Sequence, residues 1–127
     1  MNYNELKDKL KELKAEEIVW IIYIGIIAIS FYSNNLERKY YIYNDLNSKE
    51  KYRKTMILIF SILVVVYLYF LKDSYDSLKQ LKLNDTQKKK NFVYLSFIGS
   101  LLIAVSGFIF LYIAIKDEDL DVEIAFN

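Results

Sequence analysis

The chain of 127 residues contains no cysteine, no histidine and no proline. Without cysteine it forms no disulfide and offers neither a thiolate nucleophile nor a zinc thiolate ligand. Without histidine it lacks the commonest general base and metal ligand. No other residue pattern suggests chemistry, so we expect no catalytic residue, no metal site and no cofactor. A lipid-modifying enzyme remains a remote alternative.

The net charge is also small: 17 basic residues and 16 acidic residues give a net charge of +1. This balance argues against a strongly basic nucleic-acid-binding protein. The composition is 54% hydrophobic and still 26% charged, although globular domains average about 45–50% apolar residues. Such values coexist when apolar and charged residues are segregated into blocks.

Three long stretches carry no charge: residues 18–36, 55–71 and 91–115. A membrane-spanning helix needs about 20 apolar residues, and roughly 17–25 suffice. The third stretch holds fifteen Leu, Ile, Val or Phe residues. At about −0.3 to −0.6 kcal/mol each, they contribute on the order of −4 to −9 kcal/mol to the free energy of membrane insertion, and the polar residues of the stretch offset part of this. We therefore predict an all-α, polytopic membrane protein with three transmembrane helices.

Two other interpretations of these stretches are disfavoured. A soluble three-helix bundle would show a polar residue at every third or fourth position, whereas Ser61 is the only polar residue among residues 57–66. A signal peptide needs a positively charged start, whereas residues 2–17 carry four lysines against five acids. We therefore expect the first stretch to be a retained membrane helix.

A capping-box variant, Asn-x-x-Glu/Gln, precedes each apolar stretch. The three pairs are Asn2 with Glu5, Asn47 with Glu50, and Asn84 with Gln87. They predict helices at about 3–33, 48–82 and 85–118, within one three-span domain of residues 1–127. Loops are expected at 37–54 and 72–90, with an acidic tail at 116–127. Each helix would be about 45–52 Å long, so its ends should project into water.

The projecting helix ends have amphipathic patterns. Residues 1–17 place apolar side chains on one stripe, and a second stripe lies at the far end of the second helix. In a three-span chain these ends lie on the same side, so we expect a short antiparallel stalk. Its packing residues are Leu6, Leu10, Leu13, Tyr75 and Leu78. The alternative is that the N-terminal segment lies flat on the membrane, although its polar face is as acidic as it is basic.

The third stretch contains small residues at helical spacing: Ser96, Gly99, Ser100, Ala104 and Gly107. Small residues at such spacing let two membrane helices approach closely. They could pack against the protein's own first or second helix, or they could form an oligomer interface. The sequence leaves both possibilities open.

The basic residues predict an orientation. Ten lie in residues 1–17 and 72–90 together, and seven lie in residues 37–54 and the tail. The positive-inside rule then places the N-terminus in the cytoplasm and the C-terminus outside, and a composition typical of AT-rich genomes suggests a bacterial plasma membrane. Side chains expected to anchor at the headgroups are Lys51, Arg53, Lys54, Lys72, Lys88, Lys89 and Lys90.

The remaining motifs have plain interpretations. The tyrosines of residues 40–46 lie among basic residues and could stack on single-stranded nucleic acid, but tyrosine beside a membrane span more often anchors at the interface. The acids of residues 117–123 could bind a divalent cation, but they lack a calcium-loop pattern. The tail could end in a short strand at 122–126 that pairs with a partner, or it could be disordered.

The function that best fits these features is non-enzymatic and depends on helix–helix assembly. The protein would be a self-associating pore, a lesion-former or a scaffold. Its partners would be the lipid bilayer and further copies of itself. The alternative is an accessory or immunity-type subunit that binds another membrane protein. The size and three-span layout resemble phage holins, although holin tails are usually basic and this tail is acidic.

Overall fold

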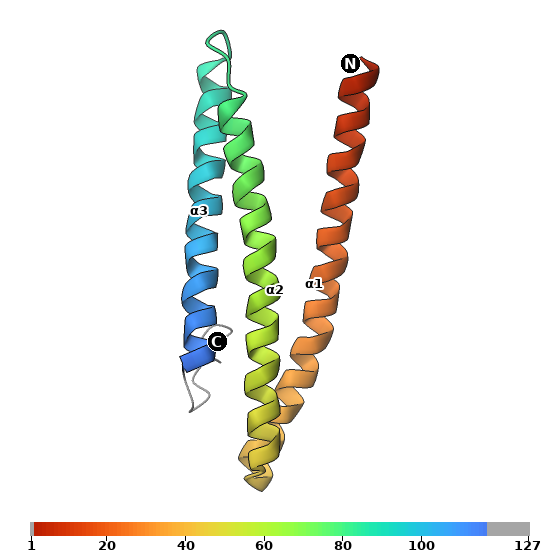
Figure 1. Ribbon diagram of the computed structural model, residues 1–127, viewed down its shortest axis with the longest axis vertical. Helices are drawn as coiled ribbons and strands as arrows, with labels where there is room; N and C mark the ends of the chain where they lie inside the picture. Colours follow the sequence, from red (N-terminus) through yellow and green to blue (C-terminus); the bar gives the residue numbers. More distant parts are fainter. Residues whose placement is uncertain (1, 117–127) are drawn as a thin grey trace.

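A computed structural model describes residues 2–116 as three long helices without a strand. Helix α1 spans Tyr3–Tyr43, α2 spans Leu46–Lys79 and α3 spans Gln87–Lys116. Consecutive helices run antiparallel, with the N-terminus and the α2–α3 connection at one end of the molecule (Figure 1). All three are long and apolar enough to cross a membrane. The prediction of an all-α protein with three such helices is confirmed.

Helix α2 is the central element (Figure 1). It supplies seven of the buried residues in the described part of the chain, against four from α1 and three from α3. Helices α1 and α3 each pack along α2 and hardly contact each other. The three helices therefore form a row with α2 in the middle, and most of their apolar surface faces outward.

The α1–α2 contact follows a seven-residue spacing. Val19, Ile26 and Ser33 are buried on α1, and residues seven apart lie on one face of a helix pair. Ser33 is 1% exposed, and its hydroxyl donates a hydrogen bond of 3.3 Å to the Met56 sulfur on α2. Near the turn, the Lys49 ammonium lies 5.4 Å from the centre of the Tyr40 ring. These contacts fix an antiparallel register.

The first helix continues well beyond its predicted end near residue 33. Ser30 is compatible with the continuing helix, because its hydroxyl donates a hydrogen bond to the Ile26 carbonyl one turn earlier. Helix α1 ends at Asn44, whose backbone is left-handed at φ 53°. Asparagine adopts this conformation more readily than most residues. The predicted loop at 37–54 is thus only a two-residue connection, Asn44 and Asp45.

Helix starts were predicted correctly at one position of three. The Asn2 side chain accepts a hydrogen bond of 2.8 Å from the Glu5 N–H and caps α1. Asn47 was the wrong cap, because Asp45 caps α2 and Asn47 lies inside the helix. Glu50 instead forms a salt bridge of 3.4 Å with Lys54.

Asn84 was also the wrong cap, because α3 begins at Gln87. The Thr86 hydroxyl accepts from the Lys89 N–H at 3.2 Å, and this places the cap two residues after Asn84. The Gln87 amide donates to Asn91 and so does not close a capping box. Helix α2 ends at Lys79 rather than at 82, and residues 117–118 of the third predicted helix lie outside the described residues.

Asp45 holds the start of α2 with two hydrogen bonds. Its carboxylate accepts from the Ser48 hydroxyl at 2.8 Å and from the Asn47 N–H at 3.1 Å. The Ser48 hydrogen bond is the main reason that the pKa of Asp45 lies below its ordinary value; partial desolvation opposes it and backbone N–H groups add to it. The ionised carboxylate is therefore the form that stabilises the turn.

We predict that Asp45→Asn changes how stability depends on pH. Because folding lowers the Asp45 pKa, its contribution is complete above the ordinary aspartate pKa of about 4 and is lost as the pH falls through the lower folded value. Wild type should exceed Asp45→Asn in melting temperature near neutral pH, and this advantage should vanish in acid. Circular dichroism melts in detergent across this range measure it. Asn47→Ala is the control and should keep the wild-type profile; parallel profiles for wild type and Asp45→Asn would contradict the prediction.

Candidate functional sites: the small-residue face of α3 and the α2–α3 cavity

The small-residue face of α3 packs mainly against α2. Ala104 and Gly107 are buried there. A Cβ at Gly107 would lie 2.8 Å from Cδ2 of the Tyr67 ring and 3.4 Å from a Val64 methyl. Glycine at this position therefore allows the Tyr67 ring to lie against the α3 backbone. On the same interface, the Phe60 and Phe110 rings stack with centres 5.8 Å apart.

A polar contact extends this interface toward the α2–α3 connection. The hydroxyl oxygens of Ser74 and Ser100 lie 2.8 Å apart, within hydrogen-bond distance. One hydroxyl can therefore satisfy the other, and the pair links α2 to α3 beside the charged end of α2. Next to this pair, the Tyr75 and Phe97 rings lie with their centres 6.2 Å apart. The α2–α3 pair is thus the more tightly joined of the two helix pairs.

Ser96 and Gly99 lie outside this contact. Ser96 is exposed, and a Cβ at Gly99 would meet no heavy atom within 4 Å. The predicted stripe therefore divides into two parts. Ser100, Ala104 and Gly107 join α3 to α2 of the same chain, whereas Ser96 lines a cavity between the two helices and Gly99 leaves open surface.

The structure does not assemble the predicted stalk. Leu6, Leu10 and Leu13 are about half exposed, and the N-terminal part of α1 diverges from α2 (Figure 1). Tyr75 contacts Phe97 of α3 instead of α1. Two helices joined at one end by a two-residue turn stay close only where their side chains interlock, and the interlocking spacing of α1 begins at Val19.

The predicted anchoring residues lie near the ends of the helices. Five of the lysines are exposed and Lys90 is half-buried; the exposed ones are Lys51, Lys54, Lys72, Lys88 and Lys89. Arg53 differs, because its guanidinium donates to the carbonyl of Ile115 at the end of α3. Arginine here satisfies one of the carbonyls that a helix end leaves without a partner.

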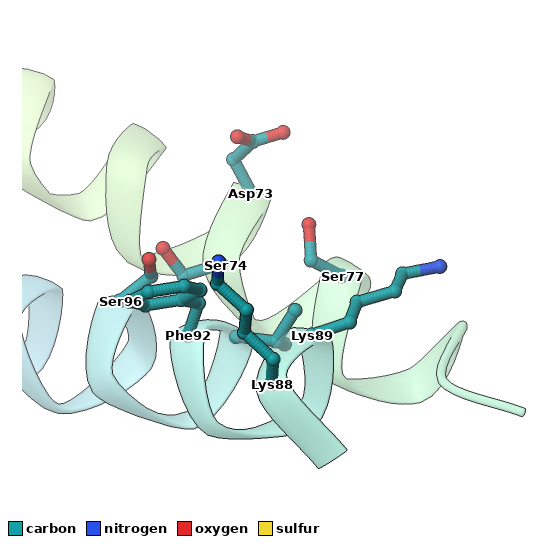
Figure 2. A pocket seen from close by; sticks show the side chains of 8 residues that line it. Asp73, Ser74, Ser77, Lys88, Lys89, Phe92 and Ser96 are labelled. Atoms are coloured by element: carbon teal, nitrogen blue, oxygen red, sulfur yellow. The ribbon is translucent and has the colours of Figure 1, made fainter. Parts of the chain in front are cut away.

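A cavity of about 520 Å³ lies between α2 and α3, next to their connection. Figure 2 shows its lining from both helices, with Lys88 extending from α3 toward α2. The lining residues are Asp73, Ser74, Ser77, Lys88, Lys89, Phe92, Val93 and Ser96. The sequence predicted Lys88 and Lys89 as surface anchors and Ser96 as a packing residue, but not that they share a cavity. One pattern in the sequence could have indicated this cavity. Ser74 and Ser77 are three residues apart, so they lie on one face of the helix that runs antiparallel to α3.

A smaller cavity, of about 100 Å³, is lined by Ser30, Ser33, Asn34, Tyr52 and Met56. Residues 2–116 contain no cluster of three or more Asp or Glu side chains that could hold a metal ion. The acids of 117–123 and the expected strand at 122–126 lie outside the described residues. Hydroxyl and ammonium groups gathered in one cavity can bind a ligand by hydrogen bonds, which is the chemistry available here.

Comparisons of the chain with protein-family models, curated proteins and solved structures gave no match. The fold alone therefore defines the class: an all-helical protein whose three apolar helices indicate a membrane location. Within this class, the particular features of the chain are the central α2, the close Gly107 contact and the cavity at the α2–α3 end.

We predict that Gly107→Leu destabilises the protein and that Gly99→Leu does not. Both changes replace a helical glycine, so they gain similar helix propensity. Only the side chain at position 107 meets Tyr67 and Val64, and overpacking of this kind costs about 1–3 kcal/mol. The free energy of unfolding in mixed detergent micelles, followed by circular dichroism, measures the difference. Equal effects at the two glycines would show that the contact with Tyr67 does not hold α3 to α2.

Proposed function

We propose that this protein is a small integral membrane protein without catalytic chemistry, which acts by helix–helix assembly in the bilayer. The observation that carries the proposal is the row arrangement of α1, α2 and α3. A closed three-helix bundle would use one face of each helix for its own core. A row leaves the outer faces of α1 and α3 uncovered, and further copies can extend it on either side.

The outer faces have suitable chemistry for close helix contact. On α1, a Cβ at Gly25 would meet no heavy atom within 4 Å, and Ala28 is exposed beside it. On α3, Gly99 is equally open. Membrane helices associate through van der Waals packing at such small residues rather than through a hydrophobic driving force. Assembly would use the open part of α3, since Ser100, Ala104 and Gly107 already bind α2.

We predict that Gly99→Cys forms disulfide-linked dimers in the membrane and that Ala104→Cys does not. The chain has no native cysteine, so each variant carries one thiol. Position 99 faces open space, whereas Ala104 is 3% exposed and covered by α2. Oxidant-treated membranes analysed by non-reducing electrophoresis provide the measurement. The particle mass of wild type in lipid nanodiscs should exceed that of one chain.

A monomeric wild type in nanodiscs, with no crosslink at Gly99→Cys, would contradict self-assembly and favour the second candidate, an accessory subunit for another membrane protein. The stripe of Leu6, Leu10 and Leu13 supports that candidate, because it is exposed and diverges from α2. An amphipathic helix with one apolar stripe fits a groove on a partner protein. A specific membrane protein that co-purifies with wild type, and is lost with Leu10→Glu, would support it.

We further propose that the N-terminus and the α2–α3 connection face the cytoplasm. They lie at the same end of the molecule (Figure 1), and residues 1–17 and 72–90 at this end carry ten lysines and arginines, against seven in residues 37–54 and Lys116. A bias of Lys and Arg toward the cytoplasmic side sets orientation.

The orientation predicts opposite labelling at the two ends. Leu83 is 98% exposed in the α2–α3 connection, and Tyr43 is 75% exposed at the α1–α2 turn. In intact bacterial cells, a membrane-impermeant maleimide should label Tyr43→Cys and not Leu83→Cys. Both should react after permeabilisation, which is the control. The reverse pattern in intact cells would invert the orientation.

A further inference from the structure

The cavity between α2 and α3 lies where the apolar part of each helix ends. Its α2 residues follow Leu71, the last residue of the second uncharged stretch, and its α3 residues extend from Lys88 to Ser96 across the start of the third. In a bilayer this level is the headgroup region. A volume of about 520 Å³ is within the range of about 300–1,000 Å³ that is typical of ligand sites.

The cavity combines hydrogen-bond donors with an apolar wall. Ser77 and Ser96 contribute hydroxyls from opposite helices, and Lys88 contributes an ammonium that lies 5.9 Å from the centre of the Phe92 ring. Phe92 and Val93 form the apolar part. Hydroxyls and an ammonium suit phosphate oxygens, while the apolar wall suits glycerol and the start of an acyl chain.

The charges in the cavity favour a singly charged phosphate. Lys88 and Lys89 line it together with the carboxylate of Asp73. The Lys89 ammonium is already 3.3 Å from Asp85 and half exposed. The Asp73 carboxylate repels a second negative charge, and a phosphate monoester carries about −1.5 to −2 at pH 7. A phosphodiester carries one, and it is the form found in phospholipid headgroups.

We infer that this α2–α3 cavity is a binding site for the phosphodiester headgroup of an anionic phospholipid. The Lys88 ammonium and the Ser77 and Ser96 hydroxyls bind the phosphate oxygens, and Phe92 contacts the glycerol end of the lipid. The inference requires the membrane location but not self-assembly, so it stands whether the protein is a monomer or an oligomer.

Native mass spectrometry of the full chain in dodecyl maltoside tests the inference. Phosphatidylglycerol and phosphatidylcholine are titrated separately, and the first retained lipid is quantified. Wild type should retain phosphatidylglycerol preferentially. Lys88→Gln should weaken its retention about tenfold, as expected for loss of one charge-assisted hydrogen bond. Lys88→Arg should keep the binding, and Ser96→Leu should reduce it by filling the cavity.

Lys79→Gln is the matched control, because the Lys79 ammonium also lies over an aromatic ring at this end, 4.6 Å from the centre of Tyr75, but does not line the cavity. It should bind like wild type.

Equal weakening by Lys79→Gln and Lys88→Gln would overturn the inference in favour of diffuse attraction to the basic end. Displacement of phosphatidylglycerol by an excess of inorganic phosphate would overturn the lipid assignment, as would equal retention of phosphatidylcholine. Unchanged helicity of the variants by circular dichroism excludes misfolding as the cause.

Discussion

The packing of α2 on both of its sides is the interaction on which the rest of the structure depends. Every extended contact among the three helices includes α2, and the buried residues are concentrated on it. A helix in lipid satisfies its own backbone hydrogen bonds but gains nothing from hiding apolar side chains. Side-chain shape and a few hydrogen bonds must then hold the helices together, and α2 supplies both through Met56 toward α1 and through Tyr67 and Ser74 toward α3.

The two sides of α2 differ in how they achieve this fit. Toward α3, glycine and alanine remove bulk so that rings approach the backbone, and a serine pair adds a hydrogen bond. Toward α1, larger side chains interlock at a seven-residue spacing and stop doing so before the N-terminal segment. Contacts with α3 reach Ser74 and Tyr75 of α2, with the cavity beside them, whereas α1 diverges. The exposed leucines at the N-terminal end of α1 are a consequence of this difference.

The sequence predicted the helices better than their limits. Three uncharged stretches without proline suffice for three helices, because length and hydropathy are local properties. The start of α2 was predicted wrongly because two possible capping residues, Asp45 and Asn47, lie two residues apart. Asp45 is the cap, since its carboxylate accepts hydrogen bonds from both the Asn47 N–H and the Ser48 hydroxyl. The predicted loop at 37–54 was wrong because α1 continues through charged residues to Tyr43 and α2 already begins at Leu46.

The sequence by itself determined the all-helical class, the three apolar helices, the Asn2 cap and the small-residue face of α3. All of these follow from neighbours along one helix. Only the tertiary structure decided that Ser100, Ala104 and Gly107 face α2, that Tyr75 meets α3 rather than α1, and that Lys88 shares a cavity with Ser77. These pairings depend on the register and rotation of two helices about each other. Apolar faces on every side of a membrane helix leave that rotation unspecified until side-chain shape fixes it.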